Sequence, residues 1–358
     1  GQGTGGSSWE QISKWSNNNN LAGLNIPLVH ADQHTMIFAP NDAFTAIFGN
    51  DGGVYYSTSG GLTIQSRNNG FVTSQFYTVG VAPTGTFTGD TDHFIGGLQD
   101  NGTQFIDGAT NNSSNPSLEV YGGDGAYTFI DKDGEYMIVS YVYNNKALLQ
   151  LPYTGSGKTL DNDSSTGSFV NPQDLDDNLD ILYANAHSSS QNFDSIVRYQ
   201  GIKTTEALVK DRIGNFNMDN KATVVKVSPF QTTSTTLFLG LANGKILKVE
   251  NANSENPTWR NLKRFNGSVS SIRFGNDENE ILATIHNYGV QSIWSSNNGG
   301  TSWMSKEGDF PDIPVKDILM NPLNNDQVII ATQLGVWATY NFKDDAPTWM
   351  QTNNGMSS

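Results

Sequence analysis

Short runs of alternating apolar and polar residues recur along the whole chain, and most end at turns rich in Gly, Asn and Asp. An alternation with a period of two is typical of strands that pack one face on a core. No stretch longer than about a dozen residues has the periodicity of a helix, and a single helical turn is expected at most, over residues 206–212. The pattern predicts an all-β protein.

Four tryptophans follow similar short sequences, and the spacing between the last three gives the length of the repeat. Trp9 follows Ser-Ser, and Trp259, Trp303 and Trp349 follow Pro-Thr, Thr-Ser and Pro-Thr; the last three lie 44 and 46 residues apart. Each follows a polar turn and opens a short alternation. Self-similarity at this period indicates one supersecondary unit repeated along the chain. We therefore predict a β-propeller of four-stranded blades, with about seven blades visible.

The repeats divide the chain into expected blades of one propeller domain, residues 1–358. These blades are 34–70, 76–123, 126–172, 178–218, 222–266, 268–310 and 314–353. The third ends in a loose polar tract, and the fourth is the least regular, with strands expected around Leu179–Ala184 and Ser195–Gln200.

The two ends of the chain are not expected to combine into one blade. Residues 1–16 are typical of the outer strand of a preceding blade, whereas the seventh blade already has its own outer strand at Trp349–Thr352. We therefore expect the chain to be a stretch of a larger propeller, with further domains in the same longer protein.

Composition narrows the classes of partner. The chain has 358 residues, 37 of them Gly, no Cys, only 20 Lys plus Arg, and a net charge of −15. The absence of Cys excludes disulfides and thiolate metal sites, and a chain without a basic stripe is not expected to bind nucleic acid. No apolar run approaches the roughly 20 residues of a membrane span, so no membrane insertion is expected. This composition is typical of a secreted or cell-surface bacterial protein.

The turn before Trp303 is the most specific motif of the sequence. Residues 296–303 have the sequence Ser-Asn-Asn-Gly-Gly-Thr-Ser-Trp, which matches the Asp-box pattern Ser-x-Asp-x-Gly-x-Thr-Trp. Ser296 opens the turn, Asn298 takes the acidic position, where a carbonyl side chain accepts N–H bonds, and Gly300 permits a positive φ. Degenerate copies occupy residues 57–64 and 2–9. We expect these turns to be structural and to lie opposite the binding face.

With this motif, the chain resembles the Asp-box (BNR-repeat) propellers, particularly the many-bladed sortilin-like and xyloglucanase-like branch. Further phrases carry the resemblance, at residues 29–34, 48–55, 96–103 and 122–125. These segments are similar to segments of secreted bacterial proteins that are labelled glycosyl hydrolases because of their repeats alone. The resemblance implies the fold, and it covers enzymes, receptors and adhesive surface proteins.

Propeller topology predicts an acidic cluster at one rim of the channel. Connections that enter the innermost strand share one end of the blade with the turns between the second and third strands. Polar residues of the first three blades gather there: His30, Asp32, His34, Asp51, Gln99, Asp100, Asn101 and Asp124. The corresponding later turns carry Asn243, Asn287 and Gln333, so the charge lies on one side.

Several chemistries suit this cluster. Its oxygens could hold a hard cation such as calcium, although the sequence defines no metal-ligand set. His30, Asp32 and His34 have the alternate spacing of side chains on one strand face, which suits a transition metal. Paired carboxylates could cleave glycosides. Asp and Asn before Gly are also the ordinary residues of tight turns.

Two hypotheses from different classes remain. The first is a non-catalytic propeller that binds a glycan or a protein on this rim through His30, His34, Gln99 and Asn101. The second is a glycoside hydrolase that uses a pair among Asp32, Asp51, Asp100 and Asp124. The arginine trio of sialidases and the Gly-x-Ser-x-Gly nucleophile motif are absent. Carboxylates tied to backbone amides would favour binding, which we prefer.

Overall fold

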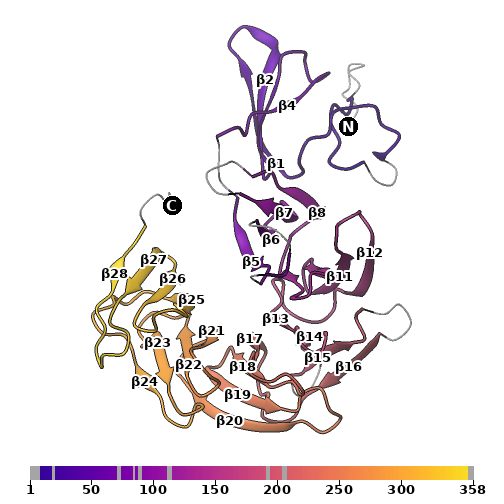
Figure 1. The fold of residues 1–358 in the computed structure, drawn as a ribbon. Helices are drawn as coiled ribbons and strands as arrows, with labels where there is room; N and C mark the ends of the chain where they lie inside the picture. The colour runs from indigo at the N-terminus through magenta and orange to yellow at the C-terminus, as the bar shows by residue number, and fades with distance from the viewer. Residues whose placement is uncertain are drawn as a thin grey trace.

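The computed structural model describes residues 9–17, 21–70, 74–83, 85–87, 91–110, 115–190, 194–203 and 208–353. The protein is all-β, with seven four-stranded antiparallel sheets in chain order (Figure 1). Within each sheet the strands are hydrogen-bonded in sequence order, as in a propeller blade. The predicted fold class is confirmed.

The first three sheets come from the N-terminal half of the chain. The first contains β1 (Gln33–Ala39), β2 (Asp42–Asn50), β3 (Gly53–Ser57) and β4 (Gln65–Ser66). The second contains β5 (Phe76–Val81), β6 (Asp92–Leu98), β7 (Thr103–Ala109) and β8 (Leu118–Tyr121). The third contains β9 (Phe129–Ile130), β10 (Tyr136–Ser140), β11 (Asn144–Gln150) and β12 (Gly157–Asp163).

The remaining four sheets follow without interruption. The fourth contains β13 (Gln173–Asp176), β14 (Ile181–Asn185), β15 (Ile196–Gln200) and β16 (Val209–Ile213). The fifth contains β17 (Ala222–Val227), β18 (Leu237–Leu241), β19 (Lys245–Glu250) and β20 (Thr258–Arg264). The sixth contains β21 (Val269–Phe274), β22 (Ile281–Ile285), β23 (Ile293–Ser296) and β24 (Met304–Ser305). The seventh contains β25 (Val315–Met320), β26 (Val328–Thr332), β27 (Gly335–Thr339) and β28 (Met350–Gln351).

The second to seventh sheets stand side by side in an arc, each packed on its neighbours (Figure 1). Adjacent residues of a strand point to opposite faces. Met137 of β10 thus packs toward the second sheet and Ile138 toward the fourth, and Leu182 and Tyr183 of β14 divide in the same way. Middle strands are therefore apolar at nearly every position, and burial on both faces stabilises them.

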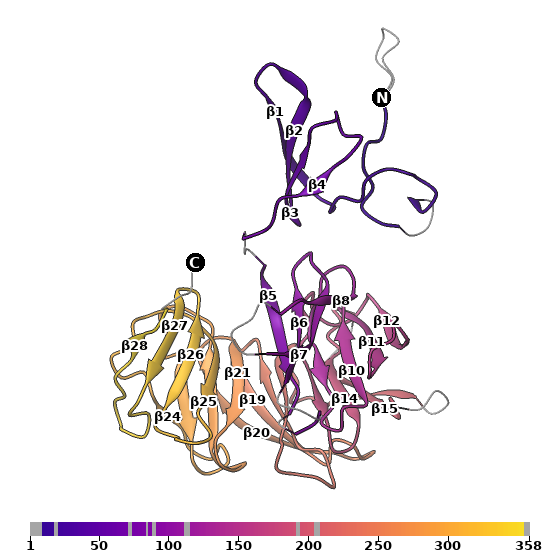
Figure 2. The same cartoon turned by 45° about the horizontal axis from the view of Figure 1, so that its top comes forward.

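The first sheet stands apart from this arc (Figure 2). Its innermost strand β1 is exposed over nearly its whole length, and Ile37 and Ile47 are 67% and 50% exposed. The end sheets of the arc also turn apolar side chains outward, with Val79 67% and Leu319 56% exposed. The sheet faces at these places are apolar but are not packed on a neighbouring sheet.

The fourth sheet differs from the sequence-based expectation. Its innermost strand is β13, which precedes the expected start at residue 178, and residues 209–213 form β16 rather than a helical turn. The polar tract of the third unit contains a regular strand, β12. In the described residues 9–17 there is no strand, only a bridge between Lys14 and Leu28.

The Asp-box turn between β23 and β24 has the expected geometry. The Asn298 Oδ1 accepts the Ser302 N–H at 2.9 Å, and the Ser296 Oγ accepts the Gly300 N–H at 2.9 Å. Gly300 has a φ of 84°, and Trp303 packs edge-on against Phe265 at 5.3 Å.

The copy at residues 57–64 repeats this pattern, with Gly61 N–H donating to Ser57 Oγ at 2.9 Å. In the N-terminal copy, residues 2–8 lie outside the described residues and Trp9 is exposed. Because Asp-box turns join the third and fourth strands, they lie at the end of the sheet opposite the turns between the second and third strands.

Replacing Asn298 by Ala is expected to lower the free energy of unfolding by about 1 kcal/mol, because the Ser302 N–H loses its acceptor. Thermal unfolding should show this as a fall in Tm of about 2 °C. Asn298→Asp keeps the acceptor and should match the wild type. Asn297→Ala, an exposed change in the same turn, is the control; an equal loss there would contradict the assigned role of Asn298.

Candidate functional site

The predicted rim residues lie where the first sheet approaches the second. Asp51 is in the β2–β3 turn, Asp100 and Asn101 are in the β6–β7 turn, and Asp124 precedes β9. The Asn101 Nδ2 donates to the Asp51 carbonyl at 3.4 Å and to the Gln99 carbonyl at 3.0 Å. These turns from two sheets therefore meet at one place.

The two histidines make separate contacts. The His30 Nε2 lies 2.6 Å from the carbonyl oxygen of Asp100, and the exposed His34 pairs through Nε2 with the Asp51 carboxylate. Asp32 precedes β1 in a left-handed conformation, with a φ of 57°. His30 thus links the start of the first sheet to the β6–β7 turn of the second, whereas His34 and Asp51 pair within the first sheet.

The carboxylates of the rim act on one another. Burial raises the pKa of Asp100, and the negative charges of Asp124, Asp51 and Asp32 raise it further. Asp124 in turn accepts the backbone N–H of Asp100 at 3.1 Å. The structure therefore brings the four predicted aspartates into one electrostatic cluster.

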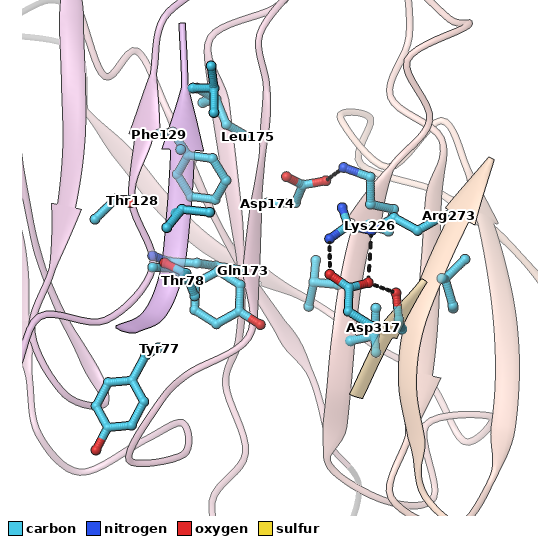
Figure 3. A pocket seen from close by; sticks show the side chains of 18 of the residues that line it. Tyr77, Thr78, Thr128, Phe129, Gln173, Asp174, Leu175, Lys226, Arg273 and Asp317 are labelled. Atoms are coloured by element: carbon cyan, nitrogen blue, oxygen red, sulfur yellow. Dashed lines mark hydrogen bonds and ion pairs between the residues drawn. The ribbon is translucent and has the colours of Figure 1, made fainter. Parts of the chain in front are cut away.

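A cavity of ≈ 610 Å³ lies among the innermost strands of the arc. Figure 3 shows Tyr77, Phe129 and Gln173 on one side of it and two ion pairs on the other. Arg273 binds Asp317 through two hydrogen bonds, of 2.6 and 3.1 Å, and the Lys226 Nζ lies 2.7 Å from the Asp174 Oδ2. The volume is within the range of small-molecule sites, about 300–1,000 Å³.

Burial shifts the pKa values of the ionisable groups that line this cavity. It would raise the pKa of Asp317, but the hydrogen bonds and charge of Arg273 outweigh it and lower that pKa. Burial raises the pKa of Tyr127 to about 12, so its hydroxyl stays protonated. Tyr77 lines the cavity, and its pKa is raised by burial and by Asp124 and Asp100. Gln75, two residues before Tyr77, accepts the N–H of Gln99 at 2.9 Å, so Tyr77 lies next to the rim turns.

Asp177 lines the cavity, and the carboxyl group of Asp131 lies within hydrogen-bonding reach of it. Asp131 follows β9, is fully buried, and its Oδ1 has no hydrogen-bond donor among the described residues. Asp177 follows β13 and accepts the backbone N–H of Lys132 at 3.0 Å. Burial raises the pKa of Asp177 to about 7, and hydrogen bonding to Asp131 contributes to the rise.

Sequence reasoning missed the residues of the cavity. Lys226 lies between Val225 and Val227, and Arg273 between Ile272 and Phe274. A charged residue between two apolar neighbours in an innermost strand was the available signal, because that strand alternates between packed and channel-facing positions. The partners of these charges, Asp174 and Asp317, lie on other innermost strands and have no sequence link to them.

Among the described residues, no three His, Asp or Glu side chains are grouped so as to hold a metal ion. In the same part of the chain, no helix has the length and apolar character that crossing a membrane requires.

The fold is similar to that of YCF48 from Cyanidioschyzon merolae, with a TM-score of 0.52 and 13% identity, covering 87% of this chain and 96% of that chain. YCF48 is an Asp-box, seven-bladed propeller-like protein. No family model and no curated protein matches the sequence. At this identity the likeness shows the fold alone: the chain is an all-β protein of the propeller type.

Asp177→Asn is expected to remove a pH-dependent loss of stability. The raised pKa of Asp177 contributes stability that is fully present below the unfolded pKa, near 4, and is lost as the pH rises to about 7. The Tm of the variant should exceed that of the wild type by an amount that grows from pH 4.5 to 7 and then levels off, at about 2–4 °C. Thermal unfolding across this pH range measures it.

Asp133→Asn is the matched control, because Asp133 is exposed and its pKa is lowered by the hydrogen bond of Lys132. Its Tm difference from the wild type should not change across the same range. Parallel pH profiles for Asp177→Asn and the wild type would show that the pKa of Asp177 is not raised in the folded protein.

Proposed function

We propose that this chain is a non-catalytic, ligand-binding propeller that holds a glycan or a protein segment where the acidic rim opens into the channel. The position of Tyr77 carries the proposal, because Tyr77 lines the cavity and lies two residues from Gln75, whose carbonyl accepts the N–H of the rim residue Gln99 at 2.9 Å. The rim turns and the cavity are therefore neighbours, and Tyr77 lies near both. Binding sites of this kind combine apolar rings with a few placed polar groups.

The contacts of the carboxylates support binding rather than hydrolysis. A glycosidase needs one carboxyl free to donate a proton and a second free to attack the sugar or activate water. Here Asp51 is paired with His34, and Asp124 accepts the N–H of Asp100. The raised pKa of Asp100 is the one feature that a hydrolase would share, and the experiment below therefore includes hydrolysis as an outcome.

The proposal also includes the branch of propellers to which the chain is related and its location in the cell. The Asp-box turns at residues 57–64 and 296–303 support a place near the sortilin-like and xyloglucanase-like propellers. The acidic, Cys-free composition supports a secreted or cell-surface location in a bacterium. The expected calcium is not part of the proposal, because no three His, Asp or Glu side chains of the described residues are grouped to hold a metal ion.

The double variant Asp100→Asn/Asp124→Asn should weaken ligand binding about tenfold or more, because charge-assisted hydrogen bonds to the rim are lost. Glycan and peptide arrays, with and without calcium, identify the ligand, and calorimetry measures its Kd. The Asn side chain at 124 can still accept the N–H of residue 100, so the Tm should change little.

The control is Asp133→Asn/Asp345→Asn, which removes two exposed carboxylates at the opposite end of the sheets. Its affinity should equal that of the wild type. Equal affinity of the rim variant and the wild type would refute the rim site. Release of reducing sugar by the wild type, lost in Asp100→Asn, would instead establish the hydrolase.

A further inference from the structure

The inner sheets of the arc turn one face to the sheet before them in the chain and the other face to the sheet after them. In the second strands of the fifth and sixth sheets, Phe238 and Leu282 hold equivalent positions and pack on the following sheet. Their neighbours Leu239 and Ala283 pack on the preceding sheet. The position of a residue in the strand ladder therefore tells which neighbouring sheet its side chain meets.

The same ladder positions assign the two unpacked faces of the arc. In the seventh sheet, Ile329 holds the position of Leu282 and is exposed, so it points to the place of a following sheet. In the second sheet, Ile95 packs on the third sheet, and the exposed Val79 and Val81 lie on the opposite face, toward the place of a preceding sheet. Each end of the arc is thus an apolar sheet face without a covering sheet.

The first sheet has the two faces that these ends lack. By the same register, its preceding face contains Met36, Phe38 and Phe48, and its following face contains Ile37 and Ile47. All of these except Phe48 are exposed. Apart from one Asp at the start of β2, strands β1 and β2 contain no Asp, Glu, Lys or Arg. Both faces of the first sheet are therefore suited to pack on another sheet.

The chain between the first and second sheets is long enough for such packing. Residues 67–75 join β4 to β5. Residues 164–172 and 306–314 are equal in number and join the third to the fourth and the sixth to the seventh sheet, which pack directly on each other. The first sheet can therefore reach a place beside the second sheet of its own chain.

One contact at the rim already has the arrangement that packed sheets show. Asn101 in the β6–β7 turn donates to the carbonyl of Asp51 in the β2–β3 turn at 3.4 Å. In the arc, the hydroxyl of Tyr288 in the β22–β23 turn donates to Gln333, next to the β26–β27 turn, at 3.1 Å. Both hydrogen bonds join the same turns of successive sheets, so the first and second sheets meet at the rim in the sense that packing requires.

We infer that the first sheet packs between the seventh and the second sheet of its own chain and closes the arc into a ring of seven sheets. Its preceding face then covers Leu319 and Ile329, and its following face covers Val79 and Val81. Removal of these apolar side chains from water drives the packing, and exposed apolar faces are typical of interaction surfaces. The cavity that the innermost strands of six sheets line gains β1 as its seventh wall.

Pairs of introduced Cys test this placement, because the chain has no Cys of its own. Phe238 and Phe274 pack across the junction of the fifth and sixth sheets, with their ring centroids 5.0 Å apart. The equivalent pairs at the two new junctions are listed by their variants, Phe38→Cys/Ile329→Cys and Ile47→Cys/Val81→Cys. The side chains replaced are exposed, so the variants should fold.

A short bismaleimide should link both pairs within one chain. Mass spectrometry identifies the linked peptides, and a denaturing gel separates links within a chain from dimers. Phe38→Cys/Arg260→Cys is the matched control, because Arg260 is exposed on β20, the outer strand of the fifth sheet. The yield of both test pairs should exceed that of the control at least about tenfold.

Small-angle scattering of the wild type tests the same inference without a variant. A compact chain of this length has a radius of gyration of about 21 Å, and the closed ring should match it. A clearly larger value for the monomer, or yields at the level of the control, would overturn the inference. Dimers in place of links within one chain would assign the gap to a second copy, and a link at Ile47/Val81 alone would leave the seventh sheet uncovered; either result would also overturn it.

Discussion

Burial of each sheet between two neighbours is the interaction on which the rest of the structure depends. Leu182 and Tyr183 are adjacent in sequence, yet one belongs to the apolar cluster shared with the third sheet and the other to that shared with the fifth. Such two-sided packing fixes each sheet relative to the next, and with it the innermost strands that surround the cavity. The first sheet has the same strand order but no such packing, and its innermost strand is correspondingly exposed.

The same packing explains why charged residues are tolerated in the channel wall. Asp317 lies on β25 and Arg273 on β21, so their ion pair spans a junction between two sheets. Lys226 and Asp174 bridge β17 and β13 in the same way. A partly desolvated charge requires a partner held in place, and the apolar clusters behind these strands provide that rigidity. The ion pairs in turn leave the cavity electrically balanced.

Much of the fold could be predicted from the sequence, because each blade repeats its own local signals. The Asp-box turn needs only neighbouring residues: Ser296, Asn298 and Gly300 determine its hydrogen bonds. Rim placement of Asp51 and Asp100 follows from strand order alone. The prediction was incomplete for the third and fourth units, since β12 and β13 are polar strands whose pairing comes from neighbouring strands rather than from their own alternation.

The contacts across sheets could not be predicted. Nothing in the sequence links Asp131 to Asp177 or Gln173 to Ser140, because these pairs depend on how successive sheets are rotated against each other. The periodicity also gives the first sheet the same signature as the other six, so it could not indicate that this sheet stands apart. The sequence repeat predicts each blade, but the residues that line the channel depend on how neighbouring blades pack against each other.

The rim and the cavity differ in charge although they adjoin at Tyr77. Asp32, Asp51, Asp100 and Asp124 make the rim acidic, while the acidic and basic side chains of the cavity balance. A ligand that spans both would meet acceptors at the mouth and then a neutral, partly aromatic interior. Groups that donate hydrogen bonds or carry positive charge are therefore favoured at the rim, and uncharged groups in the channel. Under the proposed function, an elongated ligand would therefore lie with its donor-rich end at the rim.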